Sequence, residues 1–235
     1  MKAGVILAAG DSSRMGFPKQ LAEYKGKTIL DTVIDTVTNK FEETVVVLGH
    51  ENDTITEKID FKNSTILINE NWEEGIVSSI RTALFYLGEN KEIDSVMIFM
   101  GDQPAVNNKI IEKLLKTKYK EDEVVISKYR YKLSYPILIP KFFCTKLELL
   151  THDNLLGEDD SLFKNFDLVD FFESSEYKSK IVNFNFLEPT DYDEQNDFYS
   201  GKISLRNFLN YKLFFVQFNN DFNRFHKRYD SHRGY

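Results

Sequence analysis

The chain has few of the residues that mark secreted, zinc-binding or membrane proteins. Its 235 residues include one cysteine, Cys144, so an intrachain disulfide framework is excluded, and we expect a reducing, cytoplasmic location. The longest apolar runs, such as VMIFM and PILIP, are far shorter than the roughly 20 residues of a membrane-spanning helix. No spacing typical of a zinc site occurs among the four histidines, which are His50, His152, His226 and His232.

The charge and composition exclude two further classes of protein. A net charge of −7 gives no overall basic field, so we expect no nucleic-acid partner. With 42% hydrophobic and 29% charged residues, the chain is typical of a globular protein rather than a disordered one. Its length fits one domain with a sizeable core, and it contains no internal repeat and no proline- or serine-rich linker.

What the sequence does contain is an alternation of apolar strands and amphipathic helices. Continuously apolar strands that are each followed by a helix predict a mainly parallel sheet covered on both faces, a three-layer α/β fold with a Rossmann-like half. Expected strands are 3–9, 43–49, 64–69, 95–102 and 122–129, and expected helices are 28–37, 53–59, 78–88 and 107–119. Shorter, partly antiparallel strands are expected at 129–139, 167–172 and 180–186, with helices at about 140–151 and 159–165.

The last segment differs from the rest. We expect one domain over residues 1–200 and a basic, aromatic extension over 201–235. Seven lysines and arginines and two aspartates lie in 202–235, interleaved with phenylalanines. This pattern is compatible with a docking helix or an arm for an acidic partner. It is also compatible with an amphipathic helix packed on the domain or on a second subunit, or with a tail that has no role, and these interpretations are favoured.

The first expected strand runs into a small, cationic loop, VILAAGDSSRMGFPKQ. Loops of small residues between a strand and a helix let backbone N–H groups approach an anion, and Arg14 and Lys19 add positive charge. The spacing of Gly10 and Gly16 does not fit a dinucleotide fingerprint, and the GKT at 26–28 lacks the first glycine of a P-loop. The loop therefore indicates a phosphate site, although a tight turn with a solvated arginine remains open.

Two further stretches follow other expected strands. In NENWEEGIVSSIRTAL, Ser78 or Ser79 is a plausible N-cap for the next helix. In MIFMGDQPAV, Asp102 ends a buried strand, where one carboxylate and substrate phosphates can hold a magnesium ion. The alternative is that Asp102 caps the turn before the helix at Asn107.

Taken together, LAAGDSSRMGFPKQL, the WEEGIVSSIR stretch and GDQP resemble the MobA-like NTP transferase family, and most closely its molybdenum cofactor cytidylyltransferase branch. The resemblance covers about residues 2–195 and implies a fold of the nucleotide-diphospho-sugar transferase type. It implies that Asp102 binds Mg²⁺ or Mn²⁺, with Glu188 as a second metal ligand, and that Asp102, Lys19 and Arg14 are catalytic. The residues that it assigns to the nucleotide are Leu7, Ala8, Ala9, Gly10, Ser12, Arg14, Lys19, Ser78 and Ser79.

The implied reaction moves CMP from CTP to the terminal phosphate of molybdenum-bound molybdopterin and releases pyrophosphate. A client molybdoenzyme is the implied partner. CTP is favoured because the related guanylyltransferases usually have two glycines in place of Ala9-Gly10. Relatives often have Gly-His where this chain has Ser134-Tyr135, and their acceptor loop resembles the stretch with Gly157, Asp159 and Asp160. Transfer to a sugar or methylerythritol phosphate, and a non-catalytic accessory role, remain the alternatives.

Overall fold

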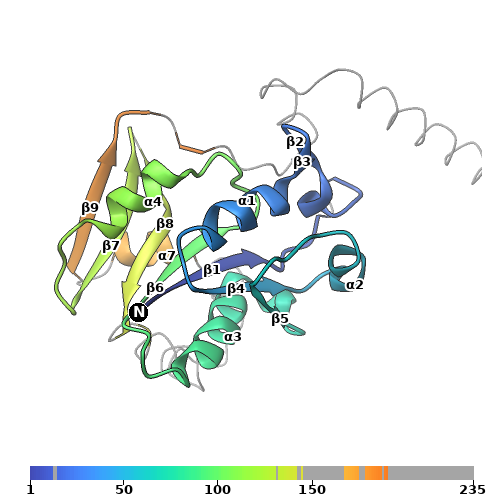
Figure 1. Ribbon diagram of the computed structural model, residues 1–235. Coiled ribbons are helices and arrows are strands. Elements are labelled where there is room, and N and C mark those ends of the chain that lie inside the picture. The colour runs from blue at the N-terminus through green and yellow to red at the C-terminus, as the bar shows by residue number, and fades with distance from the viewer. Residues whose placement is uncertain are drawn as a thin grey trace, which may run out of the picture. The chain divides into compact units, whose positions relative to one another are not determined.

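The computed structural model describes residues 1–12, 15–130, 132–141, 144, 167–174, 178–186 and 188–189 (Figure 1). Within these residues, one seven-stranded sheet has the order β5-β4-β1-β6-β8-β7-β9. Its strands are β1 (Lys2–Ala8), β4 (Glu43–Leu48), β5 (Thr65–Ile68), β6 (Ser95–Met100), β7 (Glu123–Tyr129), β8 (Lys132–Pro140) and β9 (Lys178–Phe184). A small hairpin, β2 (Glu23–Tyr24) and β3 (Lys27–Thr28), follows the first loop.

The sheet is mainly parallel, as the sequence predicts. β5, β4, β1 and β6 are parallel neighbours, β8 is antiparallel to β6 and β7, and β9 is parallel to β7. The antiparallel character expected for 129–139 is therefore confirmed. The strand expected at 180–186 is also present, as β9.

Helices cover both faces of the sheet because successive strand residues point to opposite sides. On one face, Ile6 and Phe99 pack in a cluster with side chains of α1 (Ile29–Thr38), α2 (Asn52–Thr56) and α4 (Asn108–Leu115). On the other face, Val5 and Leu7 pack with side chains of α3 (Ile76–Gly88) and α7 (Leu168–Ser174). Figure 1 shows α1 and α4 on one side of the sheet and α3 on the other. The predicted three-layer α/β architecture is confirmed.

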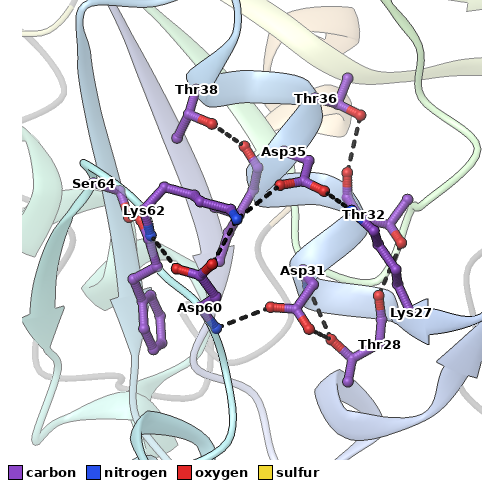
Figure 2. Close-up of polar contacts among 12 residues, drawn as sticks. Lys27, Thr28, Asp31, Thr32, Asp35, Thr36, Thr38, Asp60, Lys62 and Ser64 are labelled. Carbon is purple, nitrogen blue, oxygen red and sulfur yellow. Dashed lines mark hydrogen bonds and ion pairs between the residues drawn. The ribbon is translucent and has the colours of Figure 1, made fainter.

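A polar network joins α1 to residues that come before and after it in the chain (Figure 2). α1 is the helix that follows the first loop and the β2–β3 hairpin. The Thr28 hydroxyl caps α1 by accepting the Asp31 N–H at 3.0 Å. The Asp31 carboxylate in turn accepts the Asp60 N–H at 3.0 Å. Lys62 Nζ lies 2.5 Å from Asp60 Oδ2 and 3.8 Å from Asp35 Oδ1. These contacts fasten the segment after α2 to the exposed side of α1.

Some predicted elements differ in the structure. The strand predicted at 167–172 is wrong, because these residues form α7. Leu168 and Phe172, one helical turn apart, are both buried, and Asp167 Oδ1 accepts the Val169 N–H at 2.7 Å at the start of the helix. The helix predicted at 107–119 ends earlier, at Leu115.

Other predictions concern residues outside the described part of the chain. The helices expected at about 140–151 and 159–165 fall there, apart from Pro140, which ends β8, and Lys141 and Cys144. The chain divides into two units, Met1–Asp197 and Phe198–Tyr235, and the second unit also lies outside the described residues. The basic extension at 201–235 therefore stays a prediction. Among the described residues, no helix is both long and apolar enough to cross a membrane.

Candidate functional site

The carboxyl ends of β1, β4 and β6 lie side by side, which brings three loops together. Leu7 of β1 is in register with Val47 of β4 and with Met100 of β6. The strands that follow β1 in the chain, β4 and β5, lie on one side of it in the sheet, and the next strand, β6, lies on its other side. The strand order therefore reverses at β1, which makes this edge a topological switch point. Open α/β sheets bind ligands at the carboxyl edge at such a point.

Backbone bonds fix the end of β1 to both neighbouring turns. The Leu7 carbonyl accepts the Gly101 N–H at 2.8 Å, and the Ala9 carbonyl accepts the His50 N–H at 3.1 Å. The turn after β6 and the turn after β4 are therefore both held against the first loop. This gives the loop a rigid base on two sides.

Two glycines, Gly49 and Gly101, permit this close approach. A Cβ on Gly49 would lie 2.6 Å from the Trp72 Cβ and 2.7 Å from the Ala9 carbonyl oxygen, and one on Gly101 would lie 2.8 Å from the Ala8 Cβ. Real Cβ atoms do not tolerate contacts this short, so the loops pack as they do because both positions lack a side chain. The sequence contained a signal that our prediction missed: each glycine directly follows a buried strand.

Lys19 and Asp102 meet at this edge. Lys19 begins the short helix η1 (Lys19–Leu21), and its Nζ lies 2.6 Å from Asp102 Oδ2 in the turn after β6. The exposed fractions of the two side chains are 16% and 10%. The structure therefore brings together two of the three residues predicted to be catalytic. The third, Arg14, lies outside the described residues.

The second carboxylate oxygen of Asp102 has chemistry that suits a divalent cation. Asp102 Oδ1 is buried and has no hydrogen-bond partner among the described residues. Asn107 caps α4 by accepting the Lys109 N–H at 3.0 Å. The alternative interpretation, in which Asp102 caps the turn before that helix, is wrong, because Asp102 Oδ2 contacts Lys19 and Asp102 Oδ1 accepts no hydrogen bond from the described residues. A hard oxygen atom left without a donor is a ligand that Mg²⁺ or Mn²⁺ accepts.

No full protein cage for a metal ion is present in the described part of the chain. There, no group of three or more His, Cys, Asp or Glu residues lies close enough to hold a metal. Magnesium commonly takes one or two carboxylates and completes its shell with water and substrate phosphates. Asp102 alone fits that arrangement.

The predicted second ligand, Glu188, has another partner. Its Oε2 lies 3.3 Å from Lys132 Nζ at the start of β8, and its side chain is 22% exposed. This ion pair accounts for its carboxylate without a metal. The role of Glu188 as a metal ligand stays a prediction.

The loop that begins at Leu7 exposes little side-chain surface. Leu7, Ala8 and Ala9 are each only 5% exposed, so their side chains belong to the core. Gly10 is exposed, and a Cβ built there would meet no atom within 4 Å among the described residues. Any nucleotide at this loop would therefore meet backbone and the open space above Gly10.

Ser12 faces inward. It is 8% exposed, and its hydroxyl oxygen accepts the Lys19 N–H at 2.9 Å. Its carbonyl accepts the N–H groups of Met15 and Gly16 at 2.8 and 3.1 Å. Ser12 therefore folds the loop back towards Lys19, which the prediction of a nucleotide contact did not anticipate.

Ser78 and Ser79 do not cap α3, so the predicted N-cap is wrong. The helix begins earlier, at Ile76, after Gly75 with a φ of 96°. Both serines lie inside its first turns with exposed fractions of 2% and 4%, and Asn69 Nδ2 donates to their hydroxyls at 2.8 and 3.0 Å. The start of α3 was predicted wrongly because its N-cap is a glycine, which has no side chain that would indicate a cap in the sequence. Their contact with a nucleotide stays a prediction.

Ser134 and Tyr135 are buried as well, each 4% exposed. The Tyr135 hydroxyl lies 3.5 Å from Asp167 Oδ1. Burial, reinforced by the Asp167 carboxylate, raises the pKa of Tyr135 well above its usual value. Tyr135 is therefore a neutral phenol that points into the core. The acceptor candidates Gly157, Asp159 and Asp160 lie outside the described residues.

Known proteins resemble this chain in sequence or in fold over most of its length. The chain is 28% identical over 207 residues to a probable molybdenum cofactor guanylyltransferase of Natranaerobius thermophilus, covering 85% of this chain and 97% of that protein. A manganese complex of Rv0371C from Mycobacterium tuberculosis H37Rv matches with a TM-score of 0.60 and 20% identity, over 85% and 96% of the two chains. The 4-diphosphocytidyl-2C-methyl-D-erythritol synthase of Anaerococcus prevotii matches with a TM-score of 0.61 and 18% identity, over 85% and 95%.

At these identities the structural likeness establishes the fold, which is that of nucleotidyltransferases of the nucleotide-diphospho-sugar transferase type. The family itself follows from the sequence match. Residues 4–165, more than half of the chain, match the MobA-like NTP transferase domain. The chain therefore belongs to the MobA-like NTP transferase family.

Proposed function

We propose that this protein is a divalent-cation-dependent nucleotidyltransferase that moves CMP from CTP to the terminal phosphate of molybdenum-bound molybdopterin and releases pyrophosphate. One observation carries the proposal. Lys19 Nζ lies 2.6 Å from Asp102 at the ligand-binding edge of the sheet, while the other Asp102 oxygen is buried with no hydrogen-bond partner among the described residues. The family and the guanylyltransferase named among its relatives support the same reaction class.

Asp102 would hold Mg²⁺ or Mn²⁺ through its carboxylate. When bound, the cation neutralises charge on the phosphates and aligns them. Lys19 and Arg14 provide positive charge for the triphosphate and for the departing pyrophosphate. The backbone at Ala8, Ala9 and Gly10 would bind the nucleotide over the open space at Gly10.

The reaction requires no general base. A phosphate monoester is already anionic near neutral pH, so its oxygen attacks the α-phosphorus directly. One P–O bond forms there, the bond between the α-phosphorus and the bridging oxygen breaks, and pyrophosphate leaves with that electron pair. Catalysis then depends on alignment and on charge neutralisation. Tyr135, a neutral phenol facing the core, is not needed for proton transfer.

Two nucleoside triphosphates, CTP and GTP, are candidates for the nucleotide substrate. Ala9 stands where guanylyltransferases of the family usually have glycine, which favours CTP. The name of the curated relative, a probable guanylyltransferase, favours GTP as the second candidate. A client molybdoenzyme would receive the product.

The proposal is tested by incubating the purified protein with Mg²⁺ and molybdenum cofactor and either CTP or GTP, and by following pyrophosphate release. Turnover with CTP is the expected result. Faster turnover with GTP would transfer the proposal to the second base. Tight nucleotide binding without pyrophosphate release would contradict the enzymatic function and favour an accessory protein.

A further inference from the structure

The side chain of Gln20 crosses beneath the first loop. Gln20 is the middle residue of η1 and is 2% exposed. Its Nε2 donates to the Ala8 carbonyl at 2.9 Å. The hydroxyl of Ser12 makes a long contact of 3.5 Å with Gln20 Oε1 and accepts the Lys19 N–H at 2.9 Å. The loop is therefore closed from within by two polar side chains.

The effect of a buried amide on a fold depends on whether the amide is hydrogen-bonded. A buried primary amide that lacks partners destabilises a fold, whereas one that is hydrogen-bonded fixes the geometry of the groups around it. The bond from Gln20 joins the end of β1 to the residue directly after Lys19. The bond at Ser12 holds the Lys19 backbone itself. Lys19 thus starts from a fixed backbone position, although its side chain has many rotamers of its own.

That position decides whether Lys19 can reach Asp102. The two side chains belong to separate loops, and their 2.6 Å contact spans 83 residues of sequence. A shift of about 1 Å in a positioning group can reduce the rate of a reaction about a hundredfold. The groups that fix the Lys19 backbone therefore bear directly on the chemistry.

We propose that Gln20 is a positioning residue for nucleotidyl transfer, acting through Lys19 and supported by Ser12. The inference rests on the proposed function for the role of Lys19. Gln20 touches no substrate, because its side chain is buried and both ends of its amide face the loop. Ser12 acts in the same way, through its hydroxyl, which accepts the Lys19 N–H.

A double-mutant cycle tests this inference. Gln20→Met keeps the length of the side chain and removes the donor to Ala8. In the wild-type background it is expected to lower kcat/KM for the nucleotide about tenfold, because Lys19 moves away from the phosphates. In a Lys19→Met background the same change is expected to cost less than about twofold, since the group being positioned is gone.

A purely structural role predicts a different result. Gln20→Met would then reduce kcat/KM by the same factor in both backgrounds, or leave it unchanged, and either outcome would overturn the inference. Ser95→Ala is the matched control: Ser95 is also buried and hydrogen-bonded, to Lys2 and Asp94, but lies at the opposite end of β6. It is expected to lower the thermal midpoint without changing kcat/KM at 25 °C.

Two further measurements keep the test decisive. If Gln20→Met does not fold, Ser12→Ala removes the acceptor for the Lys19 N–H and must show the same dependence on Lys19. If the wild type releases no pyrophosphate from any nucleotide, the proposed function fails. The inference is then judged by unfolding: non-additive free energies for the Gln20 and Lys19 changes support the positioning, and additive ones refute it.

Discussion

Lys19 Nζ lies 2.6 Å from Asp102 Oδ2, although the two residues are 83 positions apart in the chain. Both side chains are mostly buried, at the edge of the sheet where open α/β folds bind ligands. A buried ion pair is weak evidence for stability, since desolvation offsets much of the attraction. We therefore interpret this pair as part of the site: the ammonium group stands beside the carboxylate that a cation would use.

Lys19→Met is expected to raise the affinity of the nucleotide-free protein for Mn²⁺. Removing a positive charge beside the carboxylate should strengthen Mn²⁺ binding at least about tenfold, because a unit charge and a divalent cation about 5 Å apart repel by roughly 1.7 kcal/mol even at the dielectric constant of water. An electron paramagnetic resonance titration of free Mn²⁺ measures this. Nucleotide affinity should fall in the same variant.

The control for that change is Lys40→Met, which also removes a lysine ion pair: Lys40 follows the end of α1, and its Nζ lies 2.6 Å from Glu112 Oε1 in α4. It should leave Mn²⁺ binding unchanged. Unchanged or weaker Mn²⁺ binding by Lys19→Met would argue that Asp102 does not receive the ion.

Gly10→Ala is expected to separate nucleotide binding from stability. A Cβ at Gly10 meets no described atom within 4 Å, so the free energy of unfolding should change by less than about 0.5 kcal/mol. A nucleotide that lies against this backbone would meet the new methyl group, and its affinity should fall about tenfold. Isothermal titration calorimetry with CTP and GTP provides the measurement. An unchanged affinity for both would place the nucleotide elsewhere.

Gly49→Ala, in contrast to Gly10→Ala, is expected to lower the stability of the fold. Its Cβ would lie 2.6 Å from the Trp72 Cβ and 2.7 Å from the Ala9 carbonyl oxygen, so the backbone must move. Overpacking of this kind costs about 1–3 kcal/mol, measurable by urea unfolding. A variant as stable as the wild type would show that the loops do not pack as described.

Asp94 is expected to give a pH-dependent contribution to stability. Burial opposes its ionisation, but hydrogen bonds from Ser95, the N-terminal amine and Lys2 lower the pKa of Asp94. A carboxylate whose folded pKa is lowered stabilises the fold above its unfolded pKa, and the contribution is lost as the pH falls through the folded pKa.

Asp94→Asn should therefore cost up to about 1 kcal/mol at pH 7, a small value because the side chain is 60% exposed. The difference from the wild type should be smaller at pH 2 than at pH 7, because the contribution is lost progressively as the pH falls from about 3.9, the ordinary pKa of aspartate, through the lower pKa of the folded state. Urea unfolding at both pH values measures it. A difference of equal size at both would contradict the assignment.

The sequence was sufficient to predict the layers of the fold and the Lys19–Asp102 edge. Continuous apolar strands fix a parallel sheet, and the carboxyl ends of parallel strands must meet at one edge. That rule brings Lys19 and Asp102 together without knowledge of their contact. The rule does not predict which side chains of a loop turn inward. The buried position of Gln20 could therefore not be predicted from the sequence.

Two secondary-structure predictions were wrong, each because of the local sequence. The short apolar run at 167–172 fits a strand or a buried helix equally well, and its tertiary contacts made it α7. Ser78 and Ser79 resemble helix caps in sequence, but the N-cap of α3 is Gly75, which has a positive φ, and the helix begins at Ile76, two residues before Ser78. Side-chain capping could not be distinguished there from burial beneath Asn69.

The most direct test of the account is Mg²⁺-dependent pyrophosphate release by Asp102→Asn. Asparagine retains an oxygen that can accept from Lys19, so the variant should fold, as circular dichroism would verify. Asp94→Asn, at the other end of β6, is the matched control and should keep wild-type turnover. We expect Asp102→Asn to lower the rate at least about a hundredfold at equal nucleotide and cofactor concentrations. Magnesium-dependent release at the wild-type rate would contradict it.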